Sequence, residues 1–304
     1  MGLTQTQKDL VGGSVGGVAQ VLVGQPFDIV KVRIQTNPSA YTSPLDCASK
    51  ILKADGPLGF YKGTLTPLLG IGACVSIQFG ALEWAKRLLS NNGEKTLGLG
   101  ELYAAGAVAG VANTAVAGPV EHIRIRLQTQ PAGAEKLYNG PLDCVRKLYG
   151  QGGLPGVFKG QAATMLRDGV GYGMYFLVYE YLVQSHCARN NCSREDISPL
   201  WALTYGATAG YGLWGSIYPV DVVKSKIQTD SLDPSKQKYR GMLDCARQTW
   251  RAQGVKGFTG GLTPTLVRSP FANGATFVAF ELAMRAMGSP EKGAPEHELP
   301  DPIY

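Results

Sequence analysis

Charged residues inside otherwise uncharged stretches are the positions of this chain best suited to bind a charged small molecule. Arg167 and Asp168 stand side by side within residues 160–179, and Arg268 stands alone among acids and bases within 257–280. A guanidinium holds a carboxylate through a forked pair of hydrogen bonds, and a carboxylate can hold an ammonium group. The pair therefore suits a zwitterion. Arg268 adds a second cation. It could bind a second carboxylate, or bind the first carboxylate together with Arg167.

The two arginines occupy equivalent places in a repeated pattern. Three glycines are each followed, seven residues later, by one of these positions: Gly63 by Gly70, Gly160 by Arg167, and Gly261 by Arg268. Seven residues span about 10 Å of helix, a depth at which unpaired charge in a membrane is costly. We interpret Arg167, Asp168, Arg268 and Gly70 as substrate-binding positions. The alternative is that Arg167 and Asp168 neutralise each other, although neighbouring helical residues do not face one another well.

A second set of charges recurs three times as Pro-x-acid-x-x-base-x-base-x-Gln. The copies begin at Pro26, Pro119 and Pro219, which are 93 and 100 residues apart. With three units around an axis, each base can reach the acid of the next unit, while the prolines bend the helices inward. The sequence thus predicts a charged ring at one end of a bundle. Its expected pairs are Lys31 with Glu121, Arg124 with Asp221, and Lys224 with Asp28.

Further elements repeat with the same period of about 100 residues. A Leu-Asp-Cys element ends at Cys47, Cys144 and Cys245, and Glu83, Glu180 and Glu281 each lie twenty residues after a glycine of the first set. Such coincident repeats indicate a chain built from similar units. We predict repeats over 1–93, 94–187 and 188–288. The Pro-rich, charged residues 289–304 are expected to be disordered.

Long uncharged windows predict helices that cross a membrane. Residues 10–27, 63–82, 102–120 and 197–220 carry no charge, and they approach or exceed the ~20 residues needed to span a bilayer. With 160–179 and 257–280 they give six candidate spans. Glycines four residues apart in the first helix of each unit would allow close helix packing. The alternative is six buried helices of a soluble protein.

Composition excludes several other classes of protein. Of 304 residues only 17% are charged and 40 are glycine, with a net charge of +6 that suits an anionic membrane surface or nucleic acid. The basic residues sit at helix ends instead of along one face with interleaved aromatics, which argues against nucleic-acid binding. The six cysteines and three histidines form no metal-type spacing. No nucleophile triad or phosphate-binding glycine loop indicates an enzyme, and the N-terminus shows no targeting signal.

The threefold signature resembles the mitochondrial carrier family over residues 8–288. The resemblance implies an all-α membrane protein with six transmembrane helices in a pseudo-threefold bundle and three short helices on the matrix side. It also implies solute exchange across the inner mitochondrial membrane by alternating access, without a cofactor, and multi-pass insertion with both termini on the intermembrane-space side. The charged ring would be the matrix gate. We expect a monomer, because one three-unit bundle is self-sufficient.

The same resemblance implies a cytoplasmic gate and lipid sites. In the family, an aromatic-acid-x-x-base motif closes the opposite end, and this chain keeps it only in part, at Glu83, Lys86, Glu180, Glu281 and Arg285. We therefore expect a resting preference for the state closed on the matrix side. The turns at Lys62-Gly63 and Lys159-Gly160 begin helices, whose free N–H groups attract anions. The implied ligand is cardiolipin, and the third turn lacks the base.

Local motifs indicate which substrate branches of this family the chain resembles. An arginine followed by an acid at 167–168 resembles the amino-acid and carnitine/acylcarnitine branches, and residues 63–76 resemble fungal Ymc-type carriers. A trimethylammonium group would favour an aromatic cage. The candidate aromatics are Tyr172, Tyr175, Phe176 and Trp214. We rank a small zwitterionic amino acid ahead of carnitine. A bundle that transports nothing and acts as a membrane adaptor is the alternative from another class, and the binding residues argue against it.

Overall fold

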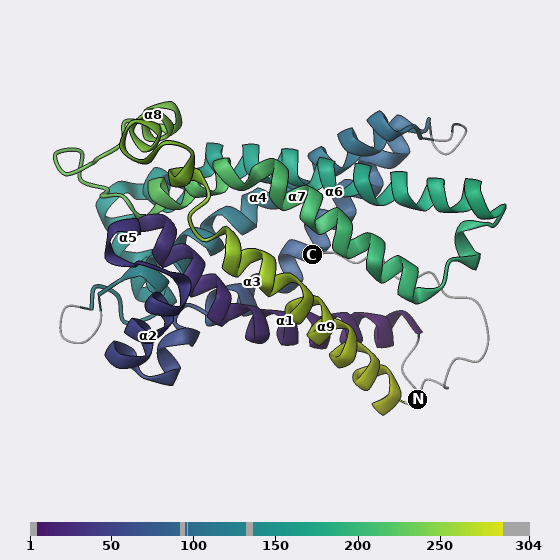
Figure 1. The fold of residues 1–304 in the computed structure, drawn as a ribbon, viewed down its shortest axis with the longest axis horizontal. Helices are drawn as coiled ribbons and strands as arrows, with labels where there is room; N and C mark the ends of the chain where they lie inside the picture. The colour runs from purple at the N-terminus through teal and green to yellow at the C-terminus, as the bar shows by residue number, and fades with distance from the viewer. Residues whose placement is uncertain (1–4, 92–94, 96, 132–135, 288–304) are drawn as a thin grey trace.

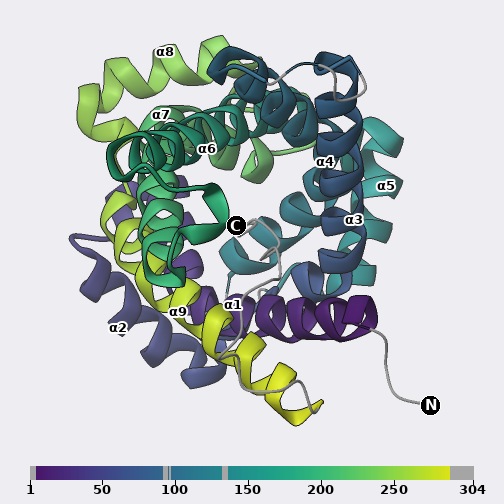
Figure 2. The same cartoon turned by 90° about the vertical axis from the view of Figure 1, so that its right-hand side faces the viewer.

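Six long helices surround a central axis in the computed structural model, which describes residues 5–91, 95, 97–131 and 136–287. Viewed along that axis the helices form a ring (Figure 2). These helices are α1 (Gln5–Thr36), α3 (Leu65–Leu89), α4 (Leu99–Thr129), α6 (Gln161–Asn190), α7 (Pro199–Thr229) and α9 (Leu262–Ala286). The predicted all-α architecture with six long helices is confirmed, and the described residues contain no strand.

Three short helices lie together at one end of the bundle (Figure 1). They are α2 (Pro44–Asp55), α5 (Pro141–Val157) and α8 (Met242–Gln253). Each buries the cysteine of its Leu-Asp-Cys element completely, in an apolar cluster shared with the long helix that precedes it. Single 3-10 turns complete the connections: η1 (Pro38–Ala40), η2 (Pro57–Tyr61), η4 (Arg194–Asp196) and η5 (Gly254–Phe258).

The two ends of the bundle differ in what they carry. We call the end with Pro26, Pro119 and Pro219 and the short helices the proline end, and the end where α1 begins and α9 finishes the terminal end. Each proline lies inside an unbroken helix: α1, α4 or α7. These three helices contact one another, so the segments that carry the repeated charges meet.

Neighbouring long helices pack closely at the predicted glycines of the first and second repeats. A Cβ atom at Gly106 would lie 2.8 Å from the Tyr172 carbonyl oxygen of α6, and one at Gly16 would lie 3.0 Å from the Thr276 carbonyl oxygen of α9. Glycine is needed at such contacts because any side chain would separate the helices. In the third repeat a Cβ at Gly210 would meet no atom within 4 Å. The expected close contact is therefore absent at that glycine.

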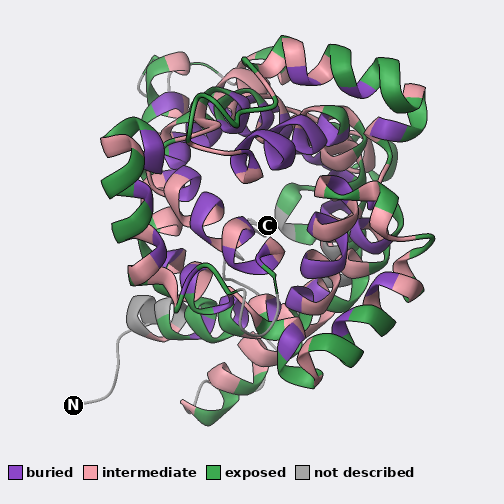
Figure 3. Ribbon diagram, turned by 90° about the vertical axis from the view of Figure 1, so that its left-hand side faces the viewer, coloured by how far each residue is buried: buried purple, intermediate pink, exposed green. Residues whose placement is uncertain are grey.

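Only one segment of the described chain, Pro57–Leu89, is long and apolar enough to be recognised as a span by composition alone. The other long helices contain charged and polar residues, some of them buried, such as Lys31, Arg167 and Lys224. Figure 3 shows buried segments toward the interior and exposed ones on the outer faces of the short helices. A helix that lines a polar interior is less apolar on average than one surrounded by lipid. The predicted tail, 289–304, lies outside the described residues.

Each predicted repeat contains the same order of elements. A long helix with a proline is followed by a short helix, a turn and a second long helix. The turns end on glycines in the left-handed conformation, with φ of 79° at Gly63, 82° at Gly160 and 79° at Gly261. These glycines rest against α4, α7 and α1 respectively. The second half of every repeat therefore starts on the first helix of the next.

Candidate functional site

At the proline end, the six predicted gate charges form three ion pairs between repeats, although not the pairs that the sequence predicted. The nitrogen–oxygen distances are 2.8 Å for Lys31–Asp221 and 2.7 Å for Arg124–Asp28, and Lys224 contacts Glu121 directly. Every base therefore meets the acid of the preceding repeat, not of the next one. The ring closes as expected, but the predicted partners were wrong.

The direction of pairing depends on the hand of the ring, which spacing does not reveal. Three residues advance about 300° around a helix, so the base points about 60° back from the acid. The two side chains of one helix thus face two different neighbours. Whether the base faces the earlier or the later repeat depends on whether the three repeats run clockwise or anticlockwise. The sequence pattern is the same in both cases.

The Lys31–Asp221 pair is reinforced by neighbouring side chains. The Lys31 ammonium lies 4.3 Å from the centre of the Trp214 ring, a favourable cation–π distance. The Gln35 amide donates to Asp221 at 3.0 Å and to the Tyr218 hydroxyl at 3.3 Å. Trp214 was predicted as part of an aromatic cage for a trimethylammonium ion. In the structure it contacts the gate lysine.

Arg167 contacts three acidic side chains of the site. Its guanidinium lies 2.9 Å from Glu121 and 3.5 Å from Asp221, two acids of the gate. Its Nε also donates to Asp168 at 2.6 Å. The expectation that Arg167 and Asp168 would face apart was wrong, because a long arginine side chain folds back to its neighbour. Asp168, 6% exposed, is thereby used to hold Arg167.

Arg268 reaches the same gate from α9. Its Nε lies 2.9 Å from Asp28, which also accepts from Arg124. Gly24 makes room for it, since a Cβ there would lie 2.7 Å from the Arg268 Nε. Gly70, the third predicted binding position, is buried, and its added Cβ would be 3.1 Å from Val120. Gly70 therefore packs against α4 and does not join the arginines.

The predicted substrate site and the predicted gate thus form one network of charges. Arg167 and Arg268 each hold an acid that a gate base also holds. A carboxylate that approached either arginine would compete with these acids for the guanidinium. In this arrangement, the binding of an anionic group can weaken the ion pairs that close the gate.

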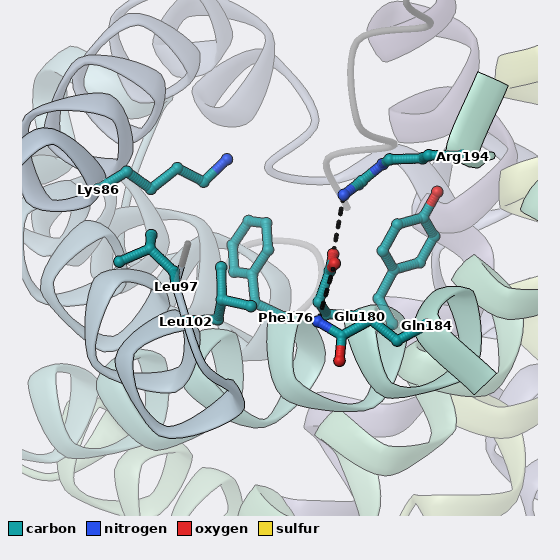
Figure 4. A pocket seen from close by; sticks show the side chains of 8 residues that line it. Lys86, Leu97, Leu102, Phe176, Glu180, Gln184 and Arg194 are labelled. Atoms are coloured by element: carbon teal, nitrogen blue, oxygen red, sulfur yellow. Dashed lines mark hydrogen bonds and ion pairs between the residues drawn. The ribbon is translucent and has the colours of Figure 1, made fainter. Parts of the chain in front are cut away.

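At the terminal end, the ion pairs of the predicted outer gate remain local among the described residues. Lys86 lies 3.5 Å from Glu83 and Arg285 lies 2.6 Å from Glu281, each within one helix. Glu180 pairs at 3.0 Å with Arg194 of η4. Figure 4 shows this pair at the edge of a pocket. Sequence reasoning missed Arg194, because it lies in a connection outside the repeated motif.

The two predicted lipid lysines have protein partners. The Lys62 ammonium lies 2.5 Å from Asp55. Lys159 donates to the carbonyl oxygens of Asp230 and Ser231 at 3.2 and 2.5 Å, and burial lowers the pKa of Lys159. A cavity of about 220 Å³ lies beside Lys62 and Gly63, bordered by the first residues of α3 and α5.

The remaining predicted aromatics lie on α6. Tyr175 and Phe176 are buried in an apolar cluster with Ala105 and Tyr179, and Tyr175 stacks on Tyr179 with ring centres 6.4 Å apart. They pack the helix interface and do not form a cage with Trp214. Within the described ranges, no group of three His, Cys, Asp or Glu side chains is placed to hold a metal ion.

Comparison with known proteins identifies similar chains. The family model described as "Mitochondrial carrier protein" matches residues 4–93, 95–188 and 195–291. The glutamate/glycine mitochondrial carrier ymc1 of Schizosaccharomyces pombe is 48% identical, over 92% of this chain and 94% of its own. The mitochondrial glycine transporter YMC1 of Saccharomyces cerevisiae is 47% identical, over 92% of each. The human mitochondrial basic amino acids transporter is 39% identical, over 95% of this chain and 93% of its own.

Proposed function

This chain belongs to the mitochondrial carrier family, and from that membership we propose that it exchanges small amino acids across the inner mitochondrial membrane by alternating access. The observation that carries the proposal is the joining of Arg167 and Arg268 to the acids of the gate. A substrate carboxylate would take over a guanidinium, and an acid released by it would receive the substrate ammonium. This exchange of partners would open the proline end.

Glycine and glutamate are the substrates we place first. The two Ymc-type relatives carry these amino acids in their names and are more similar to this chain than the basic amino acid transporter is. Two guanidiniums near the gate accommodate either one carboxylate or two. Basic amino acids are the second candidate. The relatives do not favour carnitine, and in the described part of the chain Tyr175 and Phe176 do not form an aromatic cage with Trp214.

Orientation, lipid and assembly complete the proposal. The proline end would face the matrix and both termini the intermembrane space. Cardiolipin would bind as a structural lipid beside Lys62 and Gly63, where the cavity meets the first turns of two helices. The carrier would work as a monomer and without a cofactor.

A substrate screen in proteoliposomes tests the function. Purified protein would be reconstituted into vesicles loaded with glycine, glutamate, ornithine or carnitine, and uptake of the same labelled solutes would be measured. We expect glycine and glutamate to exchange, and Arg167→Ala to abolish exchange while the variant remains folded. Exchange of carnitine alone would refute the proposed substrate. Absence of any exchange by folded protein would favour the membrane adaptor.

A further inference from the structure

Two cysteines lie together where α6 ends at the terminal end of the bundle. Cys187 is in the last turn of α6, and Cys192 follows it just after the helix. Both are free thiols, and both are partly exposed. Cys187 lies 26 residues after Gln161, the first residue of α6, and so about 39 Å along the helix. That length exceeds the ~30 Å hydrocarbon core of a bilayer, so we expect a water-soluble reagent to reach both thiols.

The turn that ends α6 sets the distance between these thiols. Asn191 is left-handed, with φ of 47° and ψ of 43°, and its backbone N–H donates to the Cys187 carbonyl oxygen. The Cys192 N–H donates to the same oxygen at 3.3 Å, which closes a turn of the Schellman type. Such a turn brings the side chains of its first and last residues together. Those residues are Cys187 and Cys192, and their thiols lie within hydrogen-bonding reach of each other.

The two thiols differ in their surroundings. The Cys187 side chain packs against the apolar cluster that contains Tyr179 and Tyr205. Cys192 lies beyond Asn190, the last residue of the helix, at the start of the connection to α7. A thiolate attacks a disulfide only where the reagent has access to it. Cys192 is therefore placed to react first, and Cys187 to react with the intermediate.

We propose that Cys187 and Cys192 form a dithiol, which a small disulfide such as oxidised glutathione converts to a disulfide within the chain. The Cys192 thiolate attacks one sulfur of the reagent, which forms a mixed disulfide and releases one molecule of reduced thiol. The Cys187 thiolate then attacks the Cys192 sulfur and releases the second molecule. The protein loses two electrons and two protons, and the reagent gains both. A disulfide needs adjacent backbones and side chains that point toward each other, and the turn supplies both.

The disulfide would also restrain a residue that contacts the predicted outer gate. Arg194 lies two residues after Cys192 and bonds to Glu180 at 3.0 Å. The disulfide would hold the start of η4 on the end of α6, and would thereby keep Arg194 at Glu180. A carboxylate held in this way is less available to a base of another repeat. This consequence rests on the proposed function, and it predicts that oxidation slows exchange.

Peptide mapping of the purified protein tests the dithiol without any transport. Trypsin cleaves after Arg189, between the two cysteines. After treatment with oxidised glutathione, mass spectrometry should find the two peptides joined, and a reductant should separate them. The reduced protein should also bind one molecule of phenylarsine oxide, which requires two adjacent thiols.

Two serine variants provide the comparison for these measurements. Cys192→Ser should lose both the joined peptides and the bound arsenical. Cys74→Ser is the matched control, since Cys74 is a partly exposed cysteine of α3, and it should keep both. An unmodified protein that forms no internal disulfide, or Cys192→Ser that still binds the arsenical, would overturn the dithiol.

Two substitutions of Asn191 test the role of the turn. Glycine adopts the left-handed conformation readily, so Asn191→Gly should leave the rate of disulfide formation nearly unchanged. Asn191→Val should lower that rate about tenfold, because a β-branched residue rarely adopts this conformation. Equal rates in the two variants would contradict the geometry on which the proposal depends.

Exchange in proteoliposomes tests the consequence for transport. Oxidation should lower the exchange rate of the unmodified protein about two- to fivefold, the effect of one exposed ion pair. A reductant should restore the rate, and Cys192→Ser should not respond to the oxidant. An oxidised protein that exchanges at the reduced rate would contradict the restraint on Arg194. If neither form exchanged an amino acid, the proposed function would fail, while the joined peptides would still report on the dithiol.

Discussion

Arg124 of the second repeat donates to the carboxylate of Asp28 in the first at 2.7 Å. The same relation, in which a base meets the acid of the repeat before it, holds at all three positions of the ring. The pairing therefore has a direction, and that direction can be tested by exchanging charges.

Reversing the observed Arg124–Asp28 pair should restore function that either single change removes. Asp28→Arg and Arg124→Asp should each lower exchange about tenfold, because removing one partner of this partly buried pair leaves the other charge unpaired, at a cost of about 1.4 kcal/mol. The double variant should recover part of the rate in proteoliposomes, but not all of it, because an arginine at position 28 would face Arg268, which bonds to Asp28 at 2.9 Å. The matched control is Asp28→Lys with Lys224→Asp, the pair that the sequence predicted. Equal recovery there would contradict the observed direction.

Arg167→Lys should fail to replace arginine. Arg167 contacts Asp168, Glu121 and a third acid through different nitrogens of one planar group, which the single ammonium of lysine cannot reproduce. We expect exchange to fall by about a hundredfold or more, corresponding to two lost charged hydrogen bonds. The measurement is initial uptake at saturating substrate. A lysine variant with normal kcat would show that charge alone is sufficient.

Gly261→Ala should destabilise the protein. Its φ of 79° costs about 1–2 kcal/mol for alanine, and the new Cβ would lie 2.9 Å from the Lys31 carbonyl oxygen. The control is Gly72→Ala in α3, where a Cβ meets no atom within 4 Å and alanine favours the helix by up to about 1 kcal/mol. Thermal unfolding in detergent should show opposite shifts. A stable Gly261→Ala variant would contradict the close contact with α1.

The cysteines of the short helices should resist alkylation in the folded protein. Cys47, Cys144 and Cys245 are completely buried, and burial raises the pKa of each thiol to about 11. At pH 8 only about one thiol in a thousand would be thiolate, the reactive form. Labelling with a maleimide, followed by mass spectrometry, should modify Cys187 and Cys192 before these three cysteines, since both are partly exposed. Fast labelling of Cys47 at pH 8 would contradict the packing of α2.

The sequence predicted much of this arrangement because a threefold repeat restricts where equivalent residues lie. The recurrence of proline, acid and base placed the ring correctly, and the seven-residue spacing brought Arg167 and Arg268 to the same level. Gly70 shares that spacing, but a glycine has no side chain whose polarity could indicate its surroundings. The sequence therefore did not show that Gly70 packs on Val120 instead of facing the axis. The spacing of residues along one helix also contains no information on the hand of the ring.

The other differences concern side chains and connections. The direction of the Cα–Cβ bond predicts well where a short side chain points. The Arg167 side chain, however, is long enough to fold back and contact Asp168. Arg194 replaces the base that the second repeat lacks at Val183, and only the path of the connection after α6 brings it to Glu180. No periodic pattern includes such a residue. It could have been suspected only as a lone arginine close in sequence to an unpaired acid.

The seating of Gly63, Gly160 and Gly261 on the next repeat has a consequence for how the bundle moves. Each repeat contacts the next one, and the third contacts the first, so a movement of one repeat would disturb its contacts with both neighbours. We therefore expect the three repeats to move together. A conformation with a passage through the whole bundle would require one unit to move alone, and this mutual obstruction opposes the leak that would discharge the membrane voltage.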